Sequence, residues 1–405
     1  MEQLPKLRPV EAHPLLHEGR PSILLRDPLR LSTESIVIPQ QWAPLLALCD
    51  GTRDASGLSA ALAVRCGVQV PPDLLGRLLA ALDQALLLDN ERSTQAQALA
   101  LAAYRQAPCR PPAMAGQSYP ADTKALRALL DGYLAAAGEA GPAATGCGLV
   151  SPHIDYARGG PFYARVWQRA AGVARAADLV VLLGTDHYGA DGRLTLTRQH
   201  YSTPLGVLPT AQEVVDALAQ ALGEEESFAD ELHHRSEHSI ELSAVWLQHV
   251  RQGQPCPVVP ILCGSFDHFV RGEAEPGQDL AMQVLVDTLR RATAGRQVLV
   301  VASADLSHVG PAFGGAPLNL VGRARVKAAD EELIARICAG DAEGFFAAVR
   351  HAGDRYSVCG LPPIYAALRI LDPVQGEALA YDHCPADENG TSTVSVCGII
   401  LKRET

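Results

Sequence analysis

The stretch Leu179-Val-Val-Leu-Leu-Gly-Thr-Asp-His187 joins a run of apolar residues to a polar ending. A short run of this kind is typical of a strand that is buried on both faces of a sheet. Three further runs have the same character, at 148–151, 258–263 and 298–303. Helical patterns lie between or after the strands, at about 160–175, 210–222, 237–250, 277–294, 322–350 and 362–371. This alternation predicts an α/β fold, with a largely parallel sheet covered by helices on both faces.

The α/β pattern begins near Pro112 and continues to the end of the chain. The last segments, 378–381 and 391–401, have the composition of closing strands. We therefore expect one domain over 112–405. Because the chain has 405 residues, a second and smaller domain is expected before it.

The N-terminal quarter has a different pattern. Residues 22–26 and 35–39 are predicted to be strands, and apolar residues recur at helical spacing over 44–49, 58–64 and 73–88. A β-hairpin followed by three short helices suggests a winged-helix-like module over 1–90. Residues 91–111 form an Ala-rich segment, predicted to be a helix, that ends in a Pro-rich linker.

Composition excludes several classes of protein. Apolar residues make up 48% of the chain, so a large core can form, but no apolar run is long enough to span a bilayer. No secretory signal is visible at the N-terminus, and the ten cysteines form no CxxC pair. The net charge is −11 without a basic stripe. We expect a cytoplasmic protein that binds neither membranes nor nucleic acid.

Histidines follow two of the predicted strands directly. His153 lies in Ser-Pro-His-Ile-Asp-Tyr after the strand at 148–151, and His187 lies in Gly-Thr-Asp-His after the strand at 179–183. Functional residues gather at the carboxyl ends of strands in such a sheet, and neutral imidazole is a preferred ligand of iron, zinc and copper. Asp305 and His308 follow the strand at 298–302 and could act as a general base, orient a substrate or only fix their loop.

Two helix starts carry further candidates. Ser236 is expected to cap a helix, and His238 and Glu241 would then project from one face of that helix. The two side chains could serve as capping groups, as partners of ligand histidines or as part of a pocket wall. Cys359 comes just before Pro362-Pro363, which are expected in a first helical turn. The helix dipole there favours a thiolate, which either binds metal or attacks a substrate.

Six motifs in order resemble the MEMO family. They are Ala115-Gly-Gln-Ser-Tyr119-Pro, Ser-Pro-His153-Ile-Asp-Tyr, Gly-Thr-Asp-His187, Glu237-His-Ser-Ile-Glu241, Ser-Ala-Asp305-Leu-Ser-His308 and Val-Cys359-Gly-Leu-Pro-Pro-Ile. The resemblance implies the three-layer α/β/α fold of the LigB-type class III extradiol dioxygenases. It further implies a mononuclear non-haem metal site of His153, His187 and Cys359, with His308, Asp305 and His238 as catalytic candidates. Iron is the expected cofactor, and copper and zinc are alternatives.

The resemblance also bears on partners. Bacterial members, called AmmeMemoRadiSam system protein B, are often encoded with AMMECR1-like and radical-SAM proteins, which are therefore the expected partners. The string that ends in Asp50-Gly-Thr-Arg53 resembles the PqqD-type domains, which implies that residues 1–90 bind a peptide as an added strand. The blander alternative is an accessory domain that packs on the body or mediates dimers.

Three functions stay open from the sequence. The first is a redox enzyme that activates O2 or an aromatic or peptidic substrate at iron. The second is storage, delivery or redox control of a metal without turnover, which the softness and oxidisability of a thiolate favour. The third is recognition of a partner peptide by a vestigial site. A hydrolase that uses Cys359 with His153 or His187 is a further alternative.

Overall fold

The structure is a computed structural model that describes residues 4–139 and 146–403. The chain folds as two compact units, Met1–Gln106 and Ala107–Thr405. Within the described residues, no helix combines the length and the apolar character that crossing a membrane requires.

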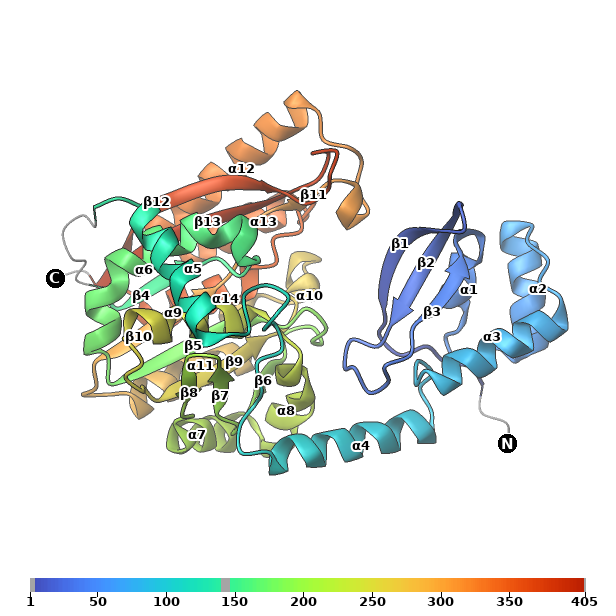
Figure 1. The fold of residues 1–405 in the computed structure, drawn as a ribbon, viewed down its shortest axis with the longest axis horizontal. Helices are drawn as coiled ribbons and strands as arrows, with labels where there is room; N and C mark the ends of the chain where they lie inside the picture. Colours follow the sequence, from blue (N-terminus) through green and yellow to red (C-terminus); the bar gives the residue numbers. More distant parts are fainter. Residues whose placement is uncertain (1–3, 140–145, 404–405) are drawn as a thin grey trace. The chain divides into compact units, whose positions relative to one another are not determined.

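The N-terminal unit is a three-stranded antiparallel sheet followed by helices (Figure 1). Its elements are β1 (Glu11–His17), β2 (Arg20–Arg26), β3 (Ile36–Pro39), the 3-10 turn η1 (Gln40–Trp42), α1 (Ala43–Leu48), α2 (Ala55–Cys66), α3 (Pro72–Gln84) and α4 (Glu91–Gln106). β2 and β3 are the two expected strands, paired from Ser22–Pro39 to Leu25–Ile36. β1 was not expected, because its mostly exposed side chains, with Pro14 at its centre, lack an apolar alternation.

The sheet of the C-terminal unit is mixed rather than largely parallel. Its order is β11-β13-β4-β10-β5-β9-β6, with β12 paired to β13. Its strands are β4 (Gly148–Ser151), β5 (Leu179–Thr185), β6 (Leu194–Leu196), β9 (Val258–Cys263), β10 (Val298–Ser303), β11 (His308–Val309), β12 (Val374–Pro385) and β13 (Thr393–Arg403). The four central strands β4, β10, β5 and β9 are parallel, as expected, and both margins are antiparallel. β7 (Tyr201–Thr203) and β8 (Gly206–Leu208) form a separate hairpin.

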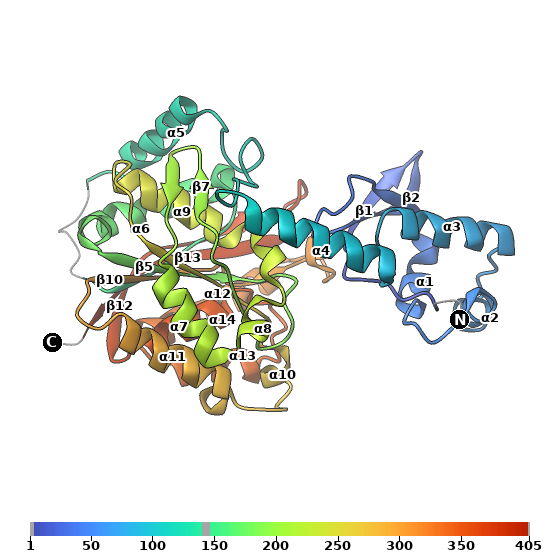
Figure 2. The ribbon, with the colours of Figure 1, turned by 90° about the horizontal axis from the view of Figure 1, so that it is seen from below.

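Helices cover both faces of this sheet, so the unit has three layers (Figure 2). The helices are α5 (Thr123–Ala136), α6 (Tyr156–Ala176), α7 (Gln212–Leu222), α8 (Glu224–Phe228), α9 (Ser239–Val250), α10 (Asp267–Val270), α11 (Leu280–Ala292), α12 (Leu320–Cys338), α13 (Ala342–His351) and α14 (Leu361–Leu371), with 3-10 turns η2 (Glu231–Arg235), η3 (Pro276–Gln278) and η4 (Pro311–Phe313). This architecture is the α/β/α fold that the resemblance implies.

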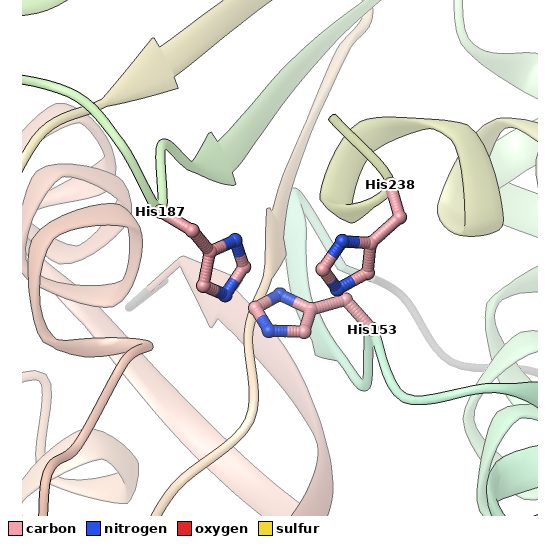
Figure 3. A group of neighbouring side chains, drawn as sticks. All are labelled: His153, His187 and His238. Carbon is pink, nitrogen blue, oxygen red and sulfur yellow. The ribbon is translucent and has the colours of Figure 1, made fainter. Parts of the chain in front are cut away.

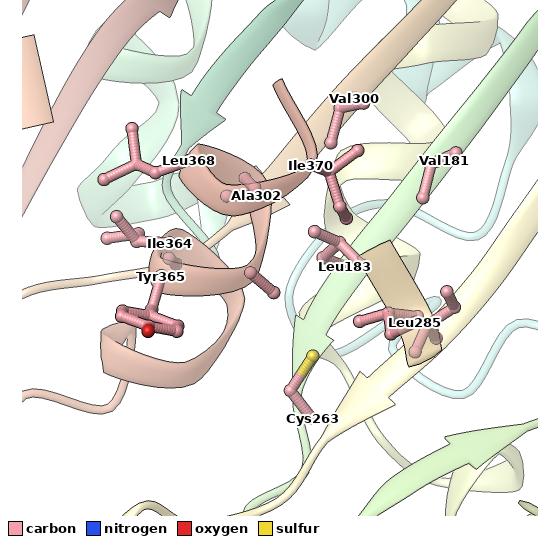
Figure 4. Close-up of a cluster of buried hydrophobic side chains, with 14 of the residues drawn as sticks. Val181, Leu183, Cys263, Leu285, Val300, Ala302, Ile364, Tyr365, Leu368 and Ile370 are labelled. Carbon is pink, nitrogen blue, oxygen red and sulfur yellow. The ribbon is translucent and has the colours of Figure 1, made fainter. Parts of the chain in front are cut away.

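Alternate residues of the parallel strands bury themselves in two different cores. In β5, Val181 and Leu183 face the helices α11 and α14 (Figure 4), whereas Val180 and Leu182 join the core that α6 and α9 build on the other face. Side chains of a strand alternate between faces, so a strand apolar at every position is one buried on both sides.

The strand order brings three carboxyl ends together. β10 lies between β4 and β5, so Ser303 stands beside Ser151 on one side and Gly184 on the other. The loops that follow these three strands, with His153, His187 and Asp305, therefore start at one edge of the sheet. β4 and β5, which are consecutive in the central part of the chain, are not neighbours.

Candidate metal centre

His153 is fixed by the end of β10. Asp155 caps α6 by accepting from Arg158 N, which leaves His153 in the short loop between β4 and this helix. The backbone N of His153 donates to Asp305 Oδ1 at 2.9 Å, and its ring Nδ1 lies 3.0 Å from the Ser303 carbonyl oxygen. A carbonyl only accepts, so Nδ1 donates a proton and Nε2 is the ring nitrogen that can bind an ion once its own proton has been displaced. The side chain is 1% exposed.

One carboxylate orients the rings of His187 and His238. Glu237 Oε2 accepts from His187 Nδ1 at 3.0 Å and from the His187 backbone N at 3.2 Å. Its other oxygen, Oε1, lies 3.0 Å from His238 Nδ1. The two rings stack with centroids 4.8 Å apart and an interplanar angle of 17°. Nδ1 of each ring is therefore occupied by the carboxylate and Nε2 is the nitrogen left to bind an ion, as in histidines that bind metal and donate their other nitrogen to a carboxylate.

The three imidazoles form one cluster. Each of His153, His187 and His238 offers a ring nitrogen, and these nitrogens lie within 4.8 Å of one another (Figure 3). The His153 ring centroid is 5.3 Å from each of the other two. Gly184 permits the approach of β5 to α9, since a Cβ there would come within 2.5 Å of Ser239 Oγ.

Cys359 adds a sulfur atom to this cluster. It directly precedes α14, whose first turn holds Pro362 as expected. Gly360 allows the loop to pack closely, because a Cβ there would come within 2.4 Å of the Asp305 carbonyl oxygen. Cys359 Sγ then lies 3.2 Å from His153 Nε2 and is also hydrogen-bonded to the rings of His187 and His308.

The charges in the cluster favour a thiolate. Burial alone would raise the pKa of the Cys359 thiol, but His153 and His308 hold it well below its usual range. Burial likewise opposes protonation of His153, yet Cys359 and Asp305 raise its pKa to about 9. The negative charge of the thiolate can be balanced by the protons of the neighbouring histidines or by a metal ion. In both cases the sulfur of Cys359 is a thiolate, which is the form that binds metal.

Asp305 and His308 stand beside this group. Asp305 is buried, and its Oδ2 lies 3.6 Å from His153 Nε2. The ring of His308 places Nδ1 3.1 Å from the Leu306 carbonyl oxygen. Its pKa is raised, since Cys359 and Asp305 outweigh the effect of burial. The structure thus brings together all six of the expected site residues.

The start of α9 differs from the expectation. Ser236 does not cap the helix, which begins at Ser239, because Glu237 Oε1 accepts from His238 N at 2.8 Å and from Ser239 N at 3.0 Å. His238 consequently precedes the helix, so it does not share a helical face with Glu241. Sequence reasoning gave Glu237 no role of its own; its position next to His238 was the available signal.

Glu241 serves a separate cluster. Its side chain is fully buried and accepts from Arg110, from Tyr119 and from the backbone N of Ala113 and of Met114, the last two at 2.8 Å. Arg110 also donates to the carbonyl oxygens of His234 and Glu237, at 2.7 and 2.8 Å. These contacts hold residues 110–119 against α9 and the turn before it.

The donor set fits a transition metal. Imidazole nitrogens and a thiolate are preferred ligands of iron, copper and zinc, and they suit magnesium or calcium poorly. Each histidine also has the partner at Nδ1 that fixes the ring of a metal ligand. Within the described residues, these three histidines have ligand atoms that all lie close enough together to hold one ion.

The chain belongs to the Memo-like protein family, whose model matches residues 110–400. It is 30% identical over 311 residues to a MEMO1 family protein of Methanopyrus kandleri, which covers 73% of this chain and 99% of that protein. A MEMO1 family protein of Thermococcus kodakarensis is 29% identical, with the same coverage. Each of these two matches covers a share of the chain close to that of the C-terminal unit.

A third relative reaches further. The MEMO1 family protein of Aquifex aeolicus is 27% identical over 392 residues, which covers 93% of this chain and 95% of its own length. Coverage of that extent requires most of residues 1–106. The N-terminal unit is thus shared with at least one other member of the family.

Proposed function

We propose that this protein binds a single metal ion through His153, His187 and Cys359. The observation that carries the proposal is the fixed orientation of both histidine rings: Nδ1 is held by the Ser303 carbonyl oxygen in one and by Glu237 in the other. Each ring is therefore ready to bind metal through Nε2, beside a sulfur that is deprotonated. Iron(II) is our first candidate, with copper and zinc next.

Residues around the donors suit redox chemistry at such a site. A bound iron ion would supply a centre that exchanges electrons with O2 or an aromatic substrate. Asp305 is positioned to orient His153 through its backbone N. His308 is positioned to hold or deliver a proton at Nε2, because Nδ1 lies against the Leu306 carbonyl oxygen. The resemblance to the ring-opening dioxygenases implies that Cys359 takes the place of their carboxylate ligand, and a thiolate is itself oxidisable.

Elemental analysis of the purified protein tests the metal site. We expect near-stoichiometric iron, copper or zinc, which Cys359→Ser and His187→Ala lose. Cys256→Ser is the matched control, since Cys256 is buried in the same unit and lies against the Ala177 carbonyl oxygen. Equal metal in all four proteins would contradict the proposal. Consumption of O2 by the iron-loaded protein with catechols would favour an enzyme, and its absence would favour metal binding without turnover.

A second function concerns the N-terminal unit, which we propose binds a peptide segment of an AMMECR1-like or radical-SAM partner. A groove of about 650 Å³ lies beside the edge strand β3 and the β1–β2 turn. Its walls are formed by residues of both, among them Arg20 and the half-exposed Val37. An edge strand with an adjacent groove suits the addition of an extended peptide. Val37→Asp should abolish binding of either partner in calorimetry and leave the metal content unchanged; unimpaired binding would refute the assignment.

A further inference from the structure

We infer that His238 is a fourth ligand of the metal ion, which makes the centre a closed set of three imidazoles and one thiolate. The inference rests on the proposed metal site and goes beyond its three ligands. It concerns a histidine that the sequence indicated as a capping group, a partner of the ligand histidines, part of a pocket wall or a catalytic group, but not as a ligand.

The distances between donor atoms support four ligands. An ion with nitrogens at about 2.0 Å and sulfur at about 2.3 Å in a tetrahedron separates its donors by roughly 3.3 to 3.6 Å. The ring nitrogens of His153, His187 and His238 lie within 4.8 Å of one another, and Cys359 Sγ lies 3.2 Å from His153 Nε2. His153 thus lies within reach of both other rings and of the sulfur, and a bound ion would draw these donors together.

The contact between Glu237 and the His238 ring favours a metal ligand over a general base at this position. Glu237 has two oxygens and uses one for the Nδ1 of each ring, so His187 and His238 have the same tautomer. Their near-parallel stacking also directs the two Nε2 atoms to the same region (Figure 3). If His187 binds metal through Nε2, the same carboxylate prepares His238 to do so.

A fourth ligand changes the chemistry of the centre. Three protein ligands leave positions for O2 or substrate, whereas four fill a tetrahedral ion. The His238 side chain is 36% exposed, against 29% for His187 and 1% for His153. His238 is therefore the ligand that an external molecule can displace. The closed form suits retention of copper(I) or zinc, and displacement of His238 would open the ion to substrate.

Cobalt(II) tests this assignment without any enzymatic assay. We expect the full-length protein loaded with cobalt(II) to show the intense visible bands of a four-coordinate ion and a thiolate charge-transfer band. His238→Ala should bind cobalt at least about tenfold more weakly and lose intensity in the visible bands. Added imidazole should restore that intensity, because it can occupy the place of the missing ring.

Controls separate the two proposals. His233→Ala removes a nearby histidine whose Nδ1 is paired with Asp186, at 2.9 Å, and it should leave the spectrum unchanged. If His238→Ala keeps the affinity and spectrum of the natural protein while His187→Ala loses both, His238 is not a ligand and the three-ligand site stands. If the natural protein shows no charge-transfer band, the proposed metal site itself is refuted.

Discussion

Two buried polar clusters meet at the start of α9, and they use similar groups in opposite ways. Around Glu241, four donors of the protein end on one acceptor: Arg110, Tyr119 and two backbone N–H groups all donate to this carboxylate. Around Glu237, four residues earlier, the carboxylate accepts from three backbone N–H groups and from two histidine rings, and it contacts each ring at Nδ1 alone. The other nitrogens are directed to each other and to Cys359.

The difference is that one cluster is satisfied within the protein, whereas the other has ring nitrogens that remain available for a ligand. A polar group that is buried for stability needs partners for all its hydrogen-bonding atoms, since an unpaired one costs about 1–3 kcal/mol. A group prepared for a ligand has some atoms fixed and others left available. The same contrast applies to the histidines. His234, beside Arg110, has both ring nitrogens paired, with Tyr201 and with the Thr195 carbonyl oxygen.

We call the group around Glu241 the closed cluster, because its donors and acceptors are paired within the protein, and the group around Glu237 the open cluster. The largest effect should follow from breaking the closed cluster. Glu241→Ala leaves the Arg110 guanidinium buried without its carboxylate, and we expect the free energy of unfolding to fall by about 3–5 kcal/mol. Urea denaturation measures this loss. Glu213→Ala is the control, because its ion pair with Arg296 is exposed and worth about 0–1 kcal/mol. A similar cost in both variants would show that the carboxylate of Glu241 stabilises the protein no more than an exposed ion pair does.

Metal removal should have the next largest effect, and it acts on the open cluster. An ion present at about 100 times its Kd stabilises the folded state by about 2.7 kcal/mol. A chelator should therefore lower the free energy of unfolding by that amount. In Cys359→Ser the same chelator should have little effect. Equal responses of the two proteins would show that the stabilising ion binds elsewhere.

Glu237→Gln should weaken the open cluster without unfolding the protein. The amide keeps one oxygen for one ring but presents an NH2 group to the other, so one histidine loses its acceptor. We expect metal affinity to fall about 10- to 100-fold, measured by competition with a chromophoric chelator. Glu231→Gln, at a buried carboxylate that accepts from Thr197, should leave the affinity intact. Unchanged affinity in Glu237→Gln would show that the rings do not depend on this residue.

The smallest effect concerns pH and the closed cluster. Burial, with Arg110 and His233, lowers the pKa of His234 from 6.5 to about 3. Below pH 6.5 the unfolded chain takes up a proton that the folded one does not, so stability falls as the pH decreases toward 3. Between pH 8 and pH 5.5 this amounts to about 1.4 kcal/mol. We would measure the free energy of unfolding by urea denaturation at pH 8 and pH 5.5, with a chelator present. Between these two pH values the natural protein should lose about 1.4 kcal/mol more than His234→Gln does. Equal losses in the two proteins would contradict the assignment.

The central strands could be predicted because they are apolar on both faces. β4, β9 and β10 have the expected bounds, and β5 extends one residue further, to Thr185. β6 and β11 were missed, since two or three residues carry no periodic signal. The order of the strands in the sheet could not be predicted from the sequence either. Local patterns identify a strand but do not say that β10 inserts between β4 and β5.

The candidate site was predictable where chemistry follows an element end. His153 and His187 come directly after strands, and Cys359 comes just before a helix, so position alone made them candidates. The place of His238 was less accessible, because it depends on where α9 begins, and Glu237 rather than Ser236 decides that point. The two roles of Glu237 and Glu241 depend on partners about 50 and 130 residues away along the chain, which spacing cannot reveal.

The position of β10 between β4 and β5 also has a consequence for synthesis of the protein. A ribosome releases both histidine loops long before Val298–Ser303 exists. Until that strand arrives, the nascent chain cannot set the final spacing of His153 and His187, and Cys359 follows later still. An emerging chain would thus carry exposed β4 and β5 edges and an incomplete ligand set. If the proposed site binds its ion through all three residues, complete metal loading is expected only after translation has passed Cys359.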